Sequence, residues 1–190
     1  MKSHLKIALV LTGSVSCLSA CAPPEQVERE LKSQEAPATT RQQSLDVAAI
    51  QGQPDFRWRP TGALAQLDLE ASAIPILAPG PTLGWAPTRT QLTPINGGHA
   101  LAMHSDDLHI FVRGTTRATV RPDLTEELST LDPAAVRTSH AHHVWSAAFQ
   151  RFGVSWLVTV ECADPHGDTR CVDDAFVHTV VKSLRILEAP

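Results

Sequence analysis

Three histidines stand close together in the segment SHAHH, and their imidazoles are candidates for metal chemistry. His140 and His142 are separated by one residue, so on an extended strand they point to the same face, about 7 Å apart along the chain. Two imidazoles presented in this way can bind Zn²⁺ or Cu²⁺. The alternative is a solvated polar segment that precedes the apolar run beginning at Val144. The sequence therefore gives a metal-site hypothesis built on His140 and His142.

A metal ion held by these two side chains needs at least one further ligand from elsewhere in the chain. The segment 99–109 can supply it if the strands that carry the two segments are neighbours. The candidate ligands in this segment are His99, His104, Asp106, Asp107 and His109. No spacing in the sequence selects one of them, so the third ligand stays open.

Two tryptophans lie where they could contact a ligand. Trp58 stands between Arg57 and Arg59, and Trp85 lies in a segment that contains Gly and Pro. Exposed tryptophans frequently form surfaces that bind a peptide, a glycan or a partner protein. The alternative is that both pack into the core, as we expect of Trp156 from its place in an apolar alternation.

Several enzyme signatures with a known mechanism do not occur in this sequence. It has no G-x-S-x-G elbow, no phosphate-binding loop of the G-x-x-x-x-G-K type, no G-x-G-x-x-G and no H-E-x-x-H. Ser155 lies within an expected strand, where a nucleophile elbow would not form. The absence of these motifs favours a non-catalytic domain. An envelope enzyme stays a rival hypothesis, because a triad assembled from distant residues has no sequence signature.

The clearest structural pattern is in the segment HHVWSAAFQRFGVSWLVTVEC. Apolar and polar residues alternate with a period of two from Val154 to Cys162, and the preceding WSAAF segment alternates in the same way. This pattern predicts a long antiparallel hairpin with Gly153 near its turn. The segment HALAMHSDDLHIFVRG predicts a second hairpin, with its turn at Ser105-Asp106-Asp107.

The end of the sequence predicts a helix. Asp173 or Asp174 can cap its N-terminus, and the expected helix runs to about Leu187. Its apolar face consists of Phe176, Val177, Val180, Val181 and Leu184. Antiparallel hairpins packed by a C-terminal helix give an α+β fold.

The N-terminal part of the chain has a different composition from the rest. Residues 21–54 are rich in Pro, Gln, Glu, Ser, Thr and Ala, with few bulky apolar side chains to bury. Such a segment is typical of a disordered tether. We therefore expect residues 55–190 to form a single globular domain.

The first residues carry the features of an export signal. Lys2 and Lys6 precede an apolar run from Ile7 to Val15, which is a charged region followed by an apolar region of signal-peptide length. The segment Leu18-Ser19-Ala20-Cys21 resembles the lipobox of bacterial lipoproteins. Cys17 fits this pattern poorly, because Ser14 stands where the lipobox has Leu.

The resemblance implies that residues 1–20 are removed as a lipoprotein signal peptide and that Cys21 becomes the acylated N-terminus. A diacylglyceryl group on the sulfur and a fatty-acyl chain such as palmitate on the amine would anchor the chain stably in a lipid bilayer. Ala22 follows the cysteine, and in Gram-negative lipoproteins this pattern is similar to that of proteins released to the outer membrane, facing the periplasm. The alternative is an ordinary secretory signal cleaved after Ala20.

The same resemblance accounts for two of the four cysteines. Cys17 would leave with the signal peptide and Cys21 would carry lipid, so Cys162 and Cys171 remain as a pair in a compartment where disulfides persist. The residues between them, ADPHGDTR, are rich in turn formers. We expect a structural disulfide; a redox-active pair is the alternative, although its spacing is wider than that of thioredoxin-like motifs.

The charge of the mature chain restricts its partners. Without residues 1–20 the chain keeps 14 Lys and Arg against 20 Asp and Glu, a net charge of −6, which argues against nucleic acid as a partner. The sequence thus predicts a membrane-anchored envelope lipoprotein whose domain binds an envelope protein partner or a ligand without catalysis. A Zn²⁺- or Cu²⁺-binding envelope protein is the first alternative.

Overall fold

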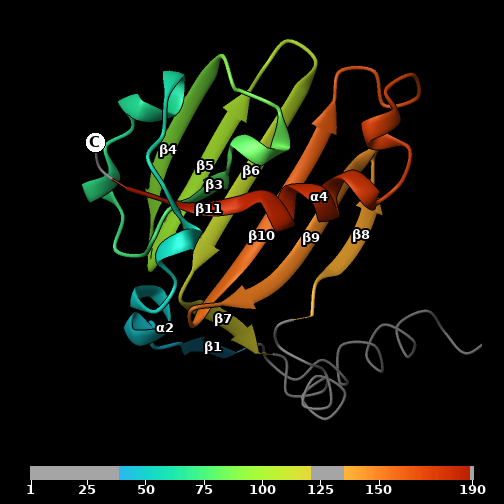
Figure 1. Cartoon of the computed structure of the whole chain (residues 1–190). Coiled ribbons are helices and arrows are strands. Elements are labelled where there is room, and N and C mark those ends of the chain that lie inside the picture. Colours follow the sequence, from blue (N-terminus) through green and yellow to red (C-terminus); the bar gives the residue numbers. More distant parts are fainter. Residues whose placement is uncertain (1–38, 121–134, 189–190) are drawn as a thin grey trace, which may run out of the picture. The chain divides into compact units, whose positions relative to one another are not determined.

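A computed structural model of the chain describes residues 39–120 and 135–188. The predicted signal peptide, the predicted lipidation site Cys21 and the first part of the predicted tether lie outside the described residues. The model is an α+β structure dominated by an antiparallel sheet (Figure 1). The predicted fold class is therefore confirmed.

Six strands form the main sheet, in the order β4-β5-β6-β10-β9-β8. Their bounds are β4 Arg89–Ile95, β5 Gly98–His104, β6 Leu108–Thr115, β8 Arg137–Ala141, β9 Val144–Arg151 and β10 Val154–Cys162. Both predicted hairpins are present: β5 pairs with β6, and β9 pairs with β10, in antiparallel register. The pairing of β10 with β6 joins two three-stranded meanders into one sheet.

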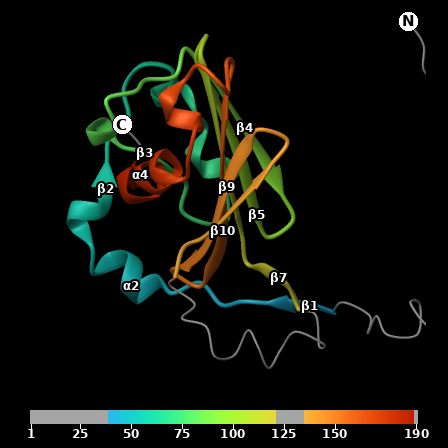
Figure 2. The same ribbon diagram turned by 90° about the vertical axis from the view of Figure 1, so that its right-hand side faces the viewer.

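One face of this sheet forms the core, and we call it the inner face. Val154, Trp156, Val158 and Val160 of β10 are buried, as their alternation predicts, while the residues between them are half-buried. β6 alternates in the same way across its length. The two α-helices of the described residues, α2 (Val47–Gln51) and α4 (Ala175–Ser183), lie on one side of the sheet in Figure 2.

Trp156 is the largest fully buried side chain, with 2% of its surface exposed. Its six-membered ring lies against Gly114 of β6, where a Cβ would stand 2.5 Å from a ring carbon. Only glycine leaves room for the indole at this position. The indole nitrogen donates to the carbonyl of Arg151 at 3.1 Å, so the one polar atom of this side chain is satisfied inside the core.

The C-terminal segment differs from the predicted single helix. α4 ends at Ser183, and residues Leu184–Leu187 form strand β11. β11 lies between β2 (Arg57–Trp58, parallel) and β3 (Leu77–Pro79, antiparallel). The prediction of a helix to Leu187 is wrong because this segment gains backbone partners on both edges, and tertiary pairing outweighs helical periodicity.

The ordered structure begins earlier in the chain than the composition suggested. Within the segment assigned to the tether, β1 (Thr39–Gln42) pairs with β7 (Arg117–Val120), and α2 follows it. Asp46 donates its backbone N–H to the carbonyl of Phe152 at 2.9 Å. At Gly153, with φ of 70°, a Cβ would meet the carbonyl oxygen of Ser44 at 1.9 Å, so the close approach of this segment requires glycine at the hairpin turn.

Short 3-10 helices connect the remaining strands. They span Pro54–Phe56, Gly62–Gln66, Leu69–Ala71, Pro81–Leu83 and Thr169–Cys171. No helix in residues 39–120 or 135–188 combines the length and the apolar composition that crossing a bilayer requires.

Candidate functional site

Most of the described histidines gather at one end of the six-stranded sheet, which we call the histidine end. The strand register places His104, His109, Glu161, Val144 and Ala141 in one row across β5, β6, β10, β9 and β8. The β8–β9 turn and the loop that follows β10 lie at the same end. The histidines at this end are His104, His109, His140, His142, His143 and His166.

The β8–β9 turn has a conformation that the sequence analysis did not anticipate. His142 and His143 have φ of 50° and 64°, and they link the paired residues Ala141 and Val144, which is the geometry of a type I′ turn. The expectation that His140 and His142 share the face of an extended strand is therefore wrong. His143, rather than His142, lies near His140.

Three imidazoles form what we call the inner histidine cluster: His140, His143 and His166. The ring centroids of His140 and His143 are 6.4 Å apart, and those of His143 and His166 are 4.8 Å apart. These residues come from β8, the β8–β9 turn and the loop after β10. They border a pocket of about 340 Å³ whose other lining residues are Pro165, Cys171 and Val172.

Trp145 and the disulfide position this cluster. The indole of Trp145 stacks on the His140 ring, with centroids 4.5 Å apart and planes inclined by 23°. Its Nε1 donates to the carbonyl of Cys171 at 3.0 Å. The predicted Cys162–Cys171 disulfide is present and closes the loop that carries His166.

The loop inside the disulfide is acidic and internally hydrogen-bonded. Asp164 accepts the backbone N–H groups of His166 and Gly167 at 3.3 and 2.9 Å. Arg170 Nε donates to Oδ1 and Oδ2 of Asp168 at 2.9 and 3.0 Å. These hydrogen bonds lower the pKa of Asp168. Arg170 also contacts Asp107 of the β5–β6 turn, so the one arginine of this loop is neutralised by two carboxylates.

No three His, Cys, Asp or Glu side chains among the described residues already stand at chelating positions. The imidazoles of the inner histidine cluster are neighbours, and their side chains would have to rotate for all three to bind one ion. His140, His142 and His143 are exposed, as is His166, so their rotamers are free to change.

On the opposite face of the sheet, the outer face, His104 and His109 form what we call the outer histidine pair. They stand directly opposite each other on β5 and β6, with ring centroids 4.5 Å apart. The Ser105–Leu108 pair next to them is hydrogen-bonded, which makes His104–His109 a non-hydrogen-bonded pair with close side chains. His109 Nδ1 lies 4.0 Å from Glu161 Oε2.

A polar pocket of about 620 Å³ adjoins the outer histidine pair. Arg89 of β4 stands opposite His104 in the register and lines the pocket with both histidines. The pKa of His104 is lowered by burial, and further by the charges of His109 and Arg89, while Glu161 raises it. The other lining residues are Ala63, Gln66, Thr88, Thr90 and Gln91.

His99, another candidate third ligand, is fully buried on the inner face and belongs to neither group. Ser72 donates its hydroxyl to the Ile74 carbonyl at 2.8 Å, so we assign the proton of His99 to Nδ1, which lies 2.8 Å from Ser72 Oγ. His99 Nε2 has no hydrogen-bond partner among residues 39–120 and 135–188. Burial lowers the pKa of His99 to about 4, so this imidazole is a neutral core group at neutral pH.

The two tryptophans considered as binding residues are both half-buried and pack against the core. Trp58 lies in β2, and its carbonyl accepts the N–H of Glu188 at 3.0 Å. Trp85 donates its indole N–H to Ser105 Oγ at 3.0 Å. The structure thus gives both residues packing contacts that tie loops to the sheet.

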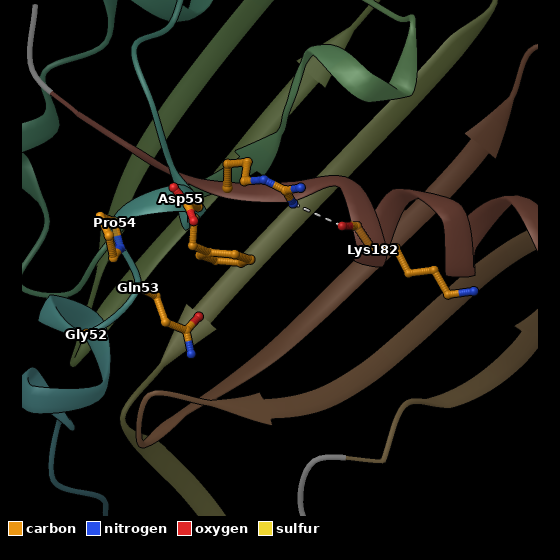
Figure 3. A pocket seen from close by; sticks show the side chains of 7 residues that line it. Gly52, Gln53, Pro54, Asp55 and Lys182 are labelled. Carbon is orange, nitrogen blue, oxygen red and sulfur yellow. Dashed lines mark hydrogen bonds between the residues drawn. The ribbon is translucent and has the colours of Figure 1, made fainter.

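A third pocket, of about 480 Å³, lies between α2 and α4 (Figure 3). Phe56 is one of its lining residues, with the guanidinium carbons of Arg151 and Arg185 at 4.8 and 5.3 Å from the ring centroid. Arg185 also donates to the Lys182 carbonyl at 3.0 Å. These cation–π contacts clamp the segment after α2 onto the C-terminal segment, which is a structural role.

Comparisons with known proteins add no name to this geometry. No protein-family model, no curated protein and no solved structure matches the chain.

Proposed function

We propose that this chain is a membrane-anchored envelope lipoprotein whose α+β domain binds a divalent transition metal without catalysing a reaction. The observation that carries the proposal is the proximity of three imidazoles, His140, His143 and His166, from three separate segments. The lipobox-like segment that ends at Cys21 supports the anchored location.

The spacing of the inner histidine cluster is close to what a metal ion needs. With metal–nitrogen distances near 2.0–2.1 Å and tetrahedral angles, the ring centroids of two ligating histidines lie about 5 Å apart. The observed separations of 4.8 and 6.4 Å fall on either side of this value. Rotation of His140 toward His143 would complete a three-nitrogen site, with water as the fourth ligand.

The backbone of the β8–β9 turn also favours a function for His143. A type I′ turn forms with least strain from Asn-Gly, and a non-glycine residue at positive φ is uncommon, although Asn, Asp and His occur there more often than other residues. Here both positions are histidines. A costly residue choice in a tight turn is typical of a functional site.

The surroundings suit a cation. Asp164 lies beside His166, and Arg170 is held by Asp107 and Asp168. The stacking of Trp145 on His140 orients the first ligand, in the manner of the outer-shell contacts that position ligands in metal sites. The imidazole ligands favour Zn²⁺ and Cu²⁺ over Ca²⁺ or Mg²⁺.

Calorimetry with the purified full chain in detergent tests the proposal, with ZnCl₂ and CuCl₂ as the probes. We expect one site with micromolar or tighter affinity, weaker at acid pH because protons compete for the imidazoles. His143→Asn and His166→Gln should each weaken binding by at least about tenfold. His142→Asn is the matched control, because it changes the neighbouring turn position, keeps a residue that tolerates positive φ, and should leave binding unchanged.

Two results would overturn the proposal. One is the absence of Zn²⁺ and Cu²⁺ binding at concentrations of about 100 μM, roughly a hundredfold above the micromolar dissociation constant expected for the site. The other is binding that His142→Asn abolishes and His166→Gln leaves intact. Circular dichroism of each variant checks that the fold is retained.

A second candidate function, binding of an envelope protein, is favoured by the outer face of the sheet. Arg113 and Arg137 are exposed there, in one cross-strand row with Ala100, Leu157 and Ala148. Arginines around a flat row of small and apolar residues complement an acidic protein surface. Cross-linking in intact envelopes should capture a protein that the Arg113→Glu, Arg137→Glu double variant fails to capture; equal capture by both chains would exclude this surface.

A further inference from the structure

The outer histidine pair has a charge environment opposite to that of the inner histidine cluster. Arg89, His104 and His109 are consecutive in one cross-strand row over β4, β5 and β6. Among the described residues, the carboxylate paired with them in the strand register is Glu161, whose Oε2 lies 4.0 Å from His109 Nδ1. Three basic side chains therefore meet one acidic side chain at this point of the outer face.

The pocket beside them offers hydrogen-bond donors. Arg89 provides a guanidinium fork, and the two imidazoles provide N–H groups. Hydroxyl and amide groups complete the lining, from Gln66, Thr88, Thr90 and Gln91. A volume of about 620 Å³ accommodates a small polar molecule.

We propose that this pocket binds a small phosphate-bearing compound, with the phosphate oxygens held by Arg89, His104 and His109. Arginine pairs with phosphate through two parallel hydrogen bonds, and its position next to the histidines directs their N–H groups to the same anion. The polar side chains of the pocket would contact the rest of the ligand. This inference is independent of the metal site, which lies on the other face of the sheet.

A metal ion is a poor occupant for the same pocket. Arg89 carries a fixed positive charge directly opposite His104, and that charge would repel a dication. An anion has the reverse effect, because it relieves the repulsion among the three basic groups. The outer histidine pair is thus an anion site even though two histidines and a glutamate also occur together in zinc sites.

The proposal predicts a dependence on pH. His104 faces Arg89 and His109 from the neighbouring strands, and Glu161 lies beyond His109. In the free protein burial, His109 and Arg89 lower the pKa of His104, and a bound dianion raises it by favouring the imidazolium. Binding should therefore take up protons and strengthen as the pH falls.

Calorimetry of the full chain in detergent tests this, with sodium phosphate and glycerol 3-phosphate as probes and glucose as the neutral control. We expect affinity roughly tenfold higher at about pH 5.5 than at about pH 8, in line with imidazole protonation. The measured heat should depend on the ionisation enthalpy of the buffer, because protons are taken up. Glucose should not bind at comparable concentrations.

Three variants locate the site. Arg89→Gln should weaken phosphate binding by at least about tenfold. Arg113→Gln is the matched control, since Arg113 is exposed on the same face but does not line the pocket, and it should have no effect. Glu161→Gln removes the competing carboxylate and should tighten binding two- to fivefold, about the effect of one exposed ion pair.

The two probes separate the possible sources of phosphate. Equal affinity for both indicates free phosphate as the ligand, and a preference for glycerol 3-phosphate indicates a lipid headgroup or another phosphate ester. Binding of neither, or binding that Arg89→Gln leaves unchanged, would overturn the proposal. His143→Asn serves to distinguish the two sites, because it should abolish metal binding and leave phosphate binding intact.

Discussion

The inner histidine cluster and the outer histidine pair lie at the same end of one sheet, yet their surroundings give them different chemistry. The inner cluster is built from a turn and a disulfide-closed loop whose arginine is neutralised by Asp107 and Asp168. The outer pair is built on two paired strands, and Arg89 stands beside it. Imidazole alone therefore does not determine the ligand. The fixed charges around it decide between a cation and an anion.

The largest expected effect is a loss of stability in acid, and the buried His99 causes it. The pKa of His99 is about 4 in the folded chain and near 6.5 when unfolded. The stability it supports is full above about pH 6.5 and is lost as the pH falls toward 4, by about 3 kcal/mol. Chemical denaturation at a series of pH values measures this loss.

His99→Gln is the variant that isolates this effect. It should flatten the dependence of the unfolding free energy on pH between 4 and 6.5, whatever its cost at neutral pH. His178→Gln, which removes a partly exposed histidine of α4, should keep the dependence. An unchanged slope in His99→Gln would assign the acid sensitivity to other groups. Asp107 and Asp168 have lowered pKa values, so they contribute only at more acid pH.

Removal of the disulfide should affect one of the two groups and spare the other. In Cys162→Ser, Cys171→Ser the loop with His166 loses its closure, which costs about 2.5 to 3 kcal/mol of stability in the chain-entropy model. Zn²⁺ affinity should fall by at least tenfold, because the loop must then be ordered on binding. Phosphate affinity should change less than twofold, and an equal loss at both sites would show that they are coupled.

Arg89→Gln should weaken anion binding at the outer histidine pair and strengthen Zn²⁺ binding there. Without the fixed positive charge, His104, His109 and Glu161 form a donor set suited to Zn²⁺. In a His143→Asn background, where the inner site is absent, the added substitution should raise Zn²⁺ affinity roughly tenfold, equivalent to about 1.4 kcal/mol. If Zn²⁺ affinity did not rise, charge would not be what distinguishes the two groups.

Trp145→Phe should have the smallest effect. The phenyl ring keeps the stacking on His140 and loses the hydrogen bond from Nε1 to the Cys171 carbonyl, which is worth about 0.5–1.5 kcal/mol. We expect Zn²⁺ binding to weaken a few fold, by positioning rather than ligation. Trp145→Ala should weaken it more, because the stacking surface is lost as well. If both variants bound Zn²⁺ as tightly as the unchanged chain, Trp145 would have no role in positioning the site.

The parts of the fold that were predictable are those with a strong local pattern. Alternation over β9 and β10 gave the long hairpin, since a period of two is a property of the strand itself. β11 was not predictable in this way, because Leu184 continues the helical spacing of α4 and only its pairing with β3 makes it a strand. Strand pairing across about a hundred residues leaves no periodic signal in one sequence.

The candidate site was predictable to the extent that turn chemistry could be recognised. The sequence predicts a turn at Ser105-Asp106-Asp107, and the structure places His104 and His109 opposite each other across it, a register that depends on the exact length of the turn. The turn at His142 and His143 lacks the Asn-Gly signature of type I′, so the sequence predicts an extended segment there. His166 lies in a loop whose path depends on the disulfide, and no spacing relates it to His143.

The close approach of Ser44 to the β9–β10 turn at Gly153 places the segment before α2 at one end of the sheet. The polypeptide enters at this turn, and β10 then runs nine residues, or about 30 Å, to the histidine end. In Figure 1 β1 and α2 accordingly lie at one end of the sheet and the turn between β5 and β6 at the other. The histidine end therefore lies a strand's length away from the place where the segment before α2 meets the sheet, so changes in that segment should leave the surroundings of the histidines unaltered.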